Sequence, residues 1–144
     1  MRTLVFYPML LALQLSAAAP AGQPVATLAI TVERVSRNGG NIRVGMYDST
    51  SWVNHEVEPV AGAVVTAISP RTVIVLHDLK PGTYGVKLFQ DYNRNGEFDF
   101  TWIGLPAEKY GFSRDPIVFF HEPDFEATKF ALRPGENTIA VHLR

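Results

Sequence analysis

The chain has 144 residues, of which 47% are hydrophobic, and its formal net charge at pH 7 is −1. This length suits one domain with a substantial core, and the balanced charge gives no electrostatic sign of binding to nucleic acid or to an anionic membrane. The absence of cysteine excludes disulfides, thiolate metal sites, a thiol nucleophile and a lipid-modified cysteine.

The N-terminal segment has the pattern of a secretory leader. Arg2 supplies a minimal basic region, an apolar run extends from Leu4 to Leu15, and small residues at 16–18 precede a cleavage position before Ala19. The run is too short to span a bilayer comfortably, and a membrane anchor or a buried helix is the alternative interpretation.

From this pattern we expect a signal peptide at residues 1–18, a short linker at residues 19–25 and a β-sandwich domain at residues 26–144. The protein is then periplasmic or secreted, with no membrane span after cleavage, and we expect a monomer.

Alternating apolar residues predict the first two strands. Residues 28–32 and residues 42–46 each place every second side chain on one face, and the Asn-Gly-containing segment at residues 36–41 is typical of a turn. We therefore expect these two strands to pair as a hairpin.

Further strands follow along the chain. Residues 61–68 fit a strand or a short helix, while four later segments fit strands: residues 72–76, 84–88, 128–132 and 139–143. Pro-Gly turns precede the strands that begin near Tyr84 and Ile139. Tyr84 fits a tyrosine corner with its hydroxyl on nearby backbone, or a core tyrosine with a solvated hydroxyl.

About seven short strands separated by turns predict an all-β antiparallel sandwich. The segment at residues 90–126 is too long for an ordinary connection, and such a segment is usually functional or contains an unrecognised element.

Two motifs in that segment carry a family resemblance. Residues 90–99 read Gln-Asp-Tyr-Asn-Arg-Asn-Gly-Glu-Phe-Asp, and residues 104–113 read Gly-Leu-Pro-Ala-Glu-Lys-Tyr-Gly-Phe-Ser. This combination resembles the bacterial DUF2141 family, in which many members have His where this chain has Gln90. The resemblance implies export and an immunoglobulin-like or prealbumin-like sandwich, and it assigns no reaction.

The first of these motifs predicts a calcium loop. Asp91, Asn93, Asn95 and Asp99 occupy alternate positions of an EF-hand-type pattern, and the backbone carbonyl of Glu97 adds another oxygen. Trp102 stands where an EF-hand has its bidentate glutamate, so this is not an EF-hand. The alternative is a turn in which the Asn and Asp side chains bond local backbone.

Aromatic residues are concentrated between residues 98 and 125, and they predict either a binding surface or a satellite core that most of the rings enter. We name Trp102, Tyr110 and Phe112 as the residues of such a surface. The four histidines are scattered, and no catalytic constellation is recognisable.

The expected function is a non-enzymatic exported binding module, with calcium as its one cofactor and an envelope protein or a glycan as its partner. The alternative is a carbohydrate-binding or carbohydrate-processing domain that uses residues 98–125, with carboxylates from the set Asp115, Glu122, Asp124 and Glu126.

Overall fold

The computed structural model describes residues 22–144, so the leader expected at residues 1–18 and the start of the expected linker lie outside the described residues. The strands are β1 (Ala26–Glu33), β2 (Asn41–Tyr47), β3 (Ala61–Thr66), β4 (Arg71–Leu79), β5 (Gly82–Asp91), β6 (Tyr110–Phe112), β7 (Phe130–Leu132) and β8 (Gly135–His142). Two short helices, α1 (Ser49–Val53) and α2 (Phe125–Thr128), accompany them. No helix in this part of the chain is long and apolar enough to cross a membrane.

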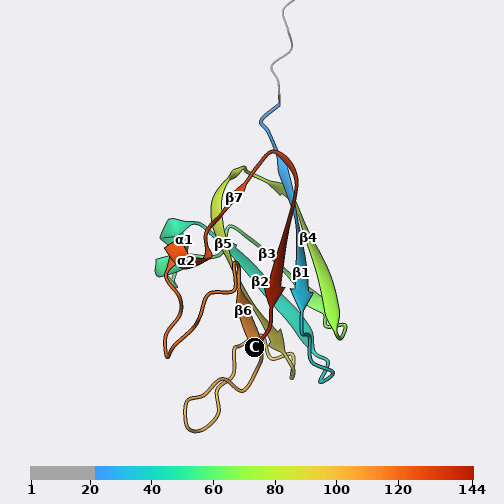
Figure 1. The fold of residues 1–144 in the computed structure, drawn as a ribbon, viewed down its shortest axis with the longest axis vertical. Helices are drawn as coiled ribbons and strands as arrows, with labels where there is room; N and C mark the ends of the chain where they lie inside the picture. Colours follow the sequence, from blue (N-terminus) through green and yellow to red (C-terminus); the bar gives the residue numbers. More distant parts are fainter. Residues whose placement is uncertain (1–21) are drawn as a thin grey trace, which may run out of the picture.

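The strands form two sheets that face each other (Figure 1). One sheet has the order β4-β1-β8, and the other has the order β3-β2-β5-β6, with β7 also paired to β5. The pairings are antiparallel except for β1 with β8, which run parallel in register from Ala26↔Gly135 to Glu33↔His142. The predicted all-β sandwich is therefore confirmed.

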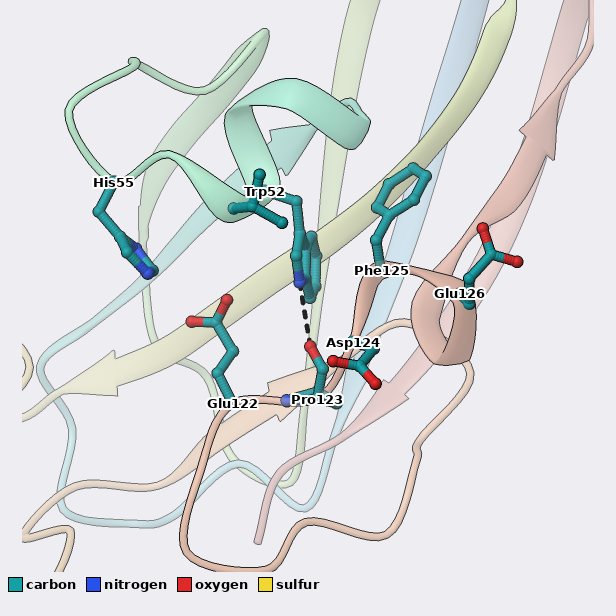
Figure 2. Close-up of a pocket in the computed structure, with 8 residues that line it drawn as sticks. Trp52, His55, Glu122, Pro123, Asp124, Phe125 and Glu126 are labelled. Atoms are coloured by element: carbon teal, nitrogen blue, oxygen red, sulfur yellow. Dashed lines mark hydrogen bonds between the residues drawn. The ribbon is translucent and has the colours of Figure 1, made fainter.

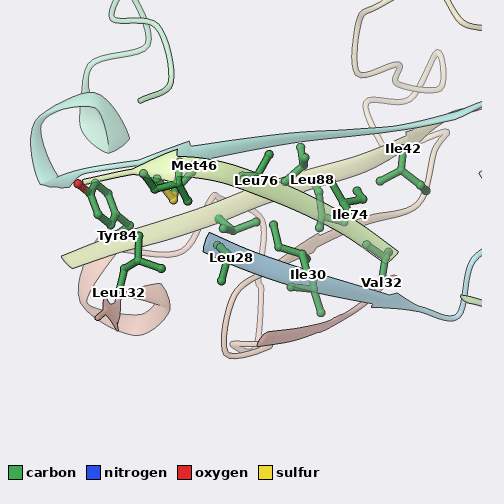
Figure 3. Close-up of a cluster of buried hydrophobic side chains, with 14 of the residues drawn as sticks. Leu28, Ile30, Val32, Ile42, Met46, Ile74, Leu76, Tyr84, Leu88 and Leu132 are labelled. Atoms are coloured by element: carbon green, nitrogen blue, oxygen red, sulfur yellow. The ribbon is translucent and has the colours of Figure 1, made fainter. Parts of the chain in front are cut away.

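The core lies between the sheets because every second residue of the long strands points inward. In β1 the buried positions include Leu28, Ile30 and Val32, which alternate with partly exposed residues. Figure 3 shows these side chains facing those of the opposite sheet, including Ile42 and Leu88. Burial of a large aliphatic side chain contributes roughly 1.5–3 kcal/mol, so this layer supplies most of the driving force for folding.

The predicted hairpin between the first two strands is wrong. β1 pairs with β4 and β8, whereas β2 pairs with β3 and β5 in the other sheet. The intervening segment crosses between the sheets, with Val35 donating its amide to the Pro70 carbonyl, and with Gly39 and Gly40 at positive φ. The turn predicted at residues 36–41 therefore belongs to a connection between the two sheets and does not close a hairpin.

A buried glutamine fixes this crossover against β5. Gln90 is fully buried; its Oε1 accepts a hydrogen bond from the Ser36 amide, and its Nε2 donates to the carbonyls of Ser36 and Gly39. All of its side-chain polar atoms are thus satisfied by backbone, which is what a buried amide requires.

Tyr84 adopts the predicted corner arrangement. Its ring is buried, and its hydroxyl donates to the Lys80 carbonyl at 2.8 Å. This bond ties the start of β5 to the turn that precedes it, as the corner interpretation predicts.

Two later segments differ in detail from the sequence predictions. Residues 61–68 contain a strand, β3, rather than a helix, and Thr128 ends α2 instead of starting a strand with Phe130. The long segment contains an element that the sequence did not reveal, the three-residue strand β6.

Candidate binding surface at the end of the sandwich

The segment between β5 and β6 is closed at its base by a buried glutamate. Glu108 accepts hydrogen bonds from the Tyr92 amide at 2.9 Å and from the Asp99 amide at 3.2 Å. These two amides lie at opposite ends of residues 91–99, which we call the Asp/Asn loop. One carboxylate therefore holds the two ends of this loop together. Sequence reasoning included Glu108 in the family motif but assigned it no role.

Asp91 is the anchor of the Asp/Asn loop. Its carboxylate is fully buried and accepts hydrogen bonds from Arg43 Nε at 2.6 Å, the Gly96 amide at 2.9 Å and the Asn95 amide at 3.1 Å. Burial by itself raises the pKa of Asp91, but the Arg43 bond, the two amides and the Arg43 charge outweigh it and lower that pKa.

The remaining loop residues also bond to protein groups. Asn93 Oδ1 accepts from the Asn95 backbone amide and Asn95 Oδ1 from the Glu97 backbone amide, which are contacts of the Asx-turn alternative. The side-chain nitrogens of Asn93 and Asn95 donate to the Asp99 carboxylate.

Calcium binding by the loop stays a prediction. The oxygen donors suit calcium, but an ion would have to displace the Arg43 guanidinium and the amide donors from Asp91 and Asp99. Within residues 22–144 no group of three or more His, Cys, Asp or Glu side chains has a metal-binding arrangement.

The chain then forms a projecting turn, which we call the Trp102 turn (residues 101–104). The Gly104 amide donates to the Thr101 carbonyl at 2.8 Å, so Trp102 and Ile103 occupy the two corners. Trp102 is 97% exposed, and Phe100, Ile103 and Leu105 are exposed beside it. In Figure 1 this loop extends beyond the strands at the end where the C-terminus lies.

A second exposed turn lies between β6 and α2, and we call it the Phe120 turn (residues 119–121). The His121 amide donates to the Phe119 carbonyl at 2.7 Å, and Phe120 has φ of 57° and a fully exposed side chain. A positive φ is uncommon for a bulky residue, so the backbone at Phe120 is strained although its ring is exposed to solvent. Ile117 and Phe119 are exposed next to it.

Arg144 connects the segments that carry the two turns. One of its guanidinium nitrogens donates to the Pro116 carbonyl at 2.8 Å, while its backbone pairs with that of Tyr110. Its side chain also lines a hollow of about 440 Å³ together with Leu105 and Tyr110.

Of the three predicted surface residues, only Trp102 is presented to solvent at a tip. Tyr110 and Phe112 belong instead to a row of packed rings on the outer face of the five-stranded sheet, with centroid spacings of 5.0 to 6.1 Å. The row comprises Phe100, Phe98, Phe89, Tyr110, Phe112, Trp52 and Phe125. The aromatic residues are therefore divided between a satellite core and an exposed surface.

Trp52 lies in this row between Phe112 and Phe125, in an environment that the sequence did not indicate. It is 2% exposed, and its indole nitrogen donates to the Pro123 carbonyl at 3.0 Å, as Figure 2 shows. The Lys87 ammonium lies 4.4 Å from the Trp52 ring centroid and 4.6 Å from that of Tyr47, and it pairs with Glu122. Burial first, and then the charges of Glu122 and Glu58, raise the pKa of Tyr47.

The carboxylates considered for carbohydrate processing have separate partners. Asp115 pairs with His142, Glu122 with Lys87 and Glu126 with Lys129, while Asp124 precedes α2 without a side-chain bond to its backbone. Glu122, Asp124 and Glu126 do line one hollow of about 320 Å³ beside Trp52 (Figure 2).

Together these features define a class of protein: an all-β sandwich that carries a clamped Asp/Asn loop and exposed apolar turns. The chain belongs to the family described as "Uncharacterized protein conserved in bacteria (DUF2141)", whose model matches residues 30–140. This confirms the resemblance seen in the sequence. Comparison with curated proteins gave no match, and comparison with solved structures gave none either.

Proposed function

We propose that this chain is an exported, non-enzymatic binding module that attaches to a component of the cell envelope through the Trp102 turn and the Phe120 turn. The observation that carries the proposal is the placement of large apolar side chains at the corners of both turns, where Trp102 and Phe120 are almost wholly exposed. The leader pattern at residues 1–18 supports the exported location.

Exposure of these side chains is unfavourable unless a partner covers them. Removing one large apolar side chain from water is worth roughly 1.5–3 kcal/mol, and clustered exposed apolar groups commonly mark interaction sites. The same segment packs half-buried Phe98 and Tyr110 against each other in the ring row. Because this segment packs some of its aromatic rings against one another, the rings that stay exposed indicate contact with another molecule.

The supports beneath the Trp102 turn favour binding with little ordering cost. Glu108 closes the loop base, Asp91 holds the Asp/Asn loop against Arg43, and Phe98 packs against Phe89 at a centroid distance of 5.5 Å. A preorganised surface loses less conformational entropy when it binds.

A glycan is the second candidate partner, as in the carbohydrate alternative. The hollow lined by Tyr92, Tyr110, Lys109 and Arg144 combines aromatic rings with hydrogen-bond donors, which is the chemistry that sugar binding uses. Leu105 also lines this hollow and exposed Ile103 lies at the neighbouring tip, and neither aliphatic side chain fits this chemistry, so the envelope proposal does not depend on it.

Sedimentation with the native envelope fraction tests the proposal. The wild-type protein should co-sediment saturably, and Trp102→Ser and Phe120→Ser should each reduce the bound fraction. Ile103→Ser and Val73→Ser form a matched pair, since these β-branched side chains are 58% and 56% exposed but only Ile103 is in a turn. Equal binding by the wild type and the turn variants would refute the proposal.

A further inference from the structure

We infer that the envelope component is the surface of a lipid bilayer, into which the Trp102 turn inserts at the level of the headgroups. This inference rests on the proposed function and names the partner. The known alternatives, a protein pocket and a glycan, are outcomes of the experiment below.

The composition of the Trp102 turn is the first support. Trp102 is flanked by Ile103, Leu105 and Phe100, all exposed. Tryptophan is enriched where membranes meet water because its ring is amphipathic, while aliphatic and phenyl side chains prefer the acyl region. Trp102 can therefore anchor the turn at the membrane–water interface, while its apolar neighbours reach into the acyl region.

The shape of the surface is the second support. Trp102, Ile103 and Phe120 stand on the corners of projecting turns, and none of them lines the hollows beside these turns. A protein partner would need two pockets matched to the spacing of the Trp102 and Phe120 turns. A fluid lipid surface has no such requirement, so it accepts convex apolar tips at any spacing.

The backbone of the Trp102 turn is the third support. The Thr101 amide donates to the Leu105 carbonyl at 2.7 Å, the Gly104 amide donates to the Thr101 carbonyl, and the Leu105 amide donates to Thr101 Oγ1 at 3.2 Å. An unpaired amide is costly in a medium that lacks water. Because the turn satisfies these donors internally, its apolar corners can leave water at less cost.

Basic residues near the base of the turns are the fourth support. Within residues 22–144 the following cations at this end of the sandwich form no ion pair: Arg34, Arg37, Arg94, Lys109 and Arg144. They lie after the ends of β1, β5 and β8 or, for Lys109, just before β6. The same end also carries the carboxylates of Asp91, Asp99 and Glu108, which accept hydrogen bonds from Arg43 and from loop groups, and that of Glu97. The unpaired cations therefore offer local contacts to lipid phosphates without giving this end a large net charge.

The two tryptophans provide the test. Trp52 is 2% exposed and Trp102 is 97% exposed, so fluorescence that is typical of a tryptophan in water comes from Trp102. The protein recovered after export is mixed with vesicles of zwitterionic phosphatidylcholine, or with vesicles that also contain anionic phosphatidylglycerol. Flotation measures binding, and the emission maximum measures insertion.

We expect emission to shift to shorter wavelength with both vesicles, and binding to be tighter with the anionic ones and weaker as salt rises. Trp102→Phe should abolish the shift, and Trp102→Ser should reduce partitioning by about fivefold or more, given the apolar area removed. Val73→Ser should match the wild type.

The outcomes separate the two claims. Envelope binding that needs Trp102, without binding to either vesicle, would overturn the lipid inference and leave the proposed function standing with a protein or glycan partner. Binding to neither envelope nor vesicles would overturn both.

Discussion

Asp91 shows how one residue links sequence, fold and binding surface. It ends β5, its carboxylate is fully buried, and it meets Arg43 from the neighbouring strand together with two amides from the loop that follows. A buried carboxylate is tolerated only with such partners. The same contacts that satisfy its charge fix the starting point of the segment that presents Trp102.

This arrangement predicts a pH dependence of stability. The pKa of Asp91 is lowered in the folded protein, so its carboxylate favours folding above the unfolded pKa of about 3.9, and that contribution is lost as the pH falls through the lower folded value. The urea midpoint of the wild type should therefore fall more steeply than that of Asp91→Asn as the pH is lowered from about 5 to below 4. The difference between the curves isolates Asp91 from other carboxylates, such as Asp48, whose pKa is also lowered. Parallel curves would contradict this role.

The corner at Tyr84 predicts a smaller effect. Tyr84→Phe keeps the buried ring and removes the hydroxyl that donates to the Lys80 carbonyl. The free energy of unfolding, measured by urea denaturation, should fall by about 0.5–1.5 kcal/mol, which is the net worth of a typical hydrogen bond. An unchanged free energy would mean that water replaces this bond without loss.

Single residues differ in how far the sequence predicts them. Tyr84 follows a Pro-Gly turn within a strand pattern, so its local neighbours indicate its bond. The exposure of Trp102 has no such signal in a list of aromatic residues, because neighbouring rings such as Phe98 enter the satellite core. What distinguishes Trp102 is its position at a turn corner before Gly104, which becomes clear only with the backbone.

At the scale of elements, the sequence located strands better than it located their partners. Alternation is a local property, and it correctly marked β1 and β2. Pairing depends on contacts far apart in the chain, and β1 lies between β4 and β8. The three-residue strand β6 was not foreseen, because an element this short has too few residues to show a period.

The Asp/Asn loop carries the calcium prediction. Calcium in this loop should bind weakly, on the order of 10⁻⁴–10⁻³ M, and at 100 times the dissociation constant it should stabilise the fold by roughly 2.7 kcal/mol. Because Arg43 occupies the Asp91 carboxylate, Arg43→Gln should increase the calcium response, while Asp91→Ala should abolish it. The measurement is the melting temperature in chelator and in millimolar calcium. If neither the wild type nor Arg43→Gln responds, the loop is an Asx-rich turn held by protein donors alone.

The whole molecule has two dissimilar ends. One end carries the Trp102 turn with both unpaired cations and the carboxylates of the Asp/Asn loop, and the other carries the turn at Tyr84 and the helices with their acidic neighbours. Strand alternation predicted the fold class and composition gave the balanced charge, but neither reports that Trp102 and its exposed apolar neighbours project from one end. An apolar tip of this kind orients a molecule at a surface.

Attachment to the envelope requires that the chain is exported. The leader pattern predicts cleavage before Ala19, so mass spectrometry of the protein from the native envelope should give an N-terminus close to that residue. Retention of Met1 in protein recovered from the cytosol would contradict the export prediction.

In the proposed attachment, Trp102 is itself at the contact with the envelope. Its 97% exposure predicts that acrylamide quenches its fluorescence strongly in the free protein, and the difference between the wild type and Trp102→Phe isolates that emission from buried Trp52. The direct measurement is this quenching before and after addition of the native envelope fraction. We expect attachment to protect Trp102 from acrylamide. Attachment with quenching of Trp102 unchanged would show that the protein binds through another surface.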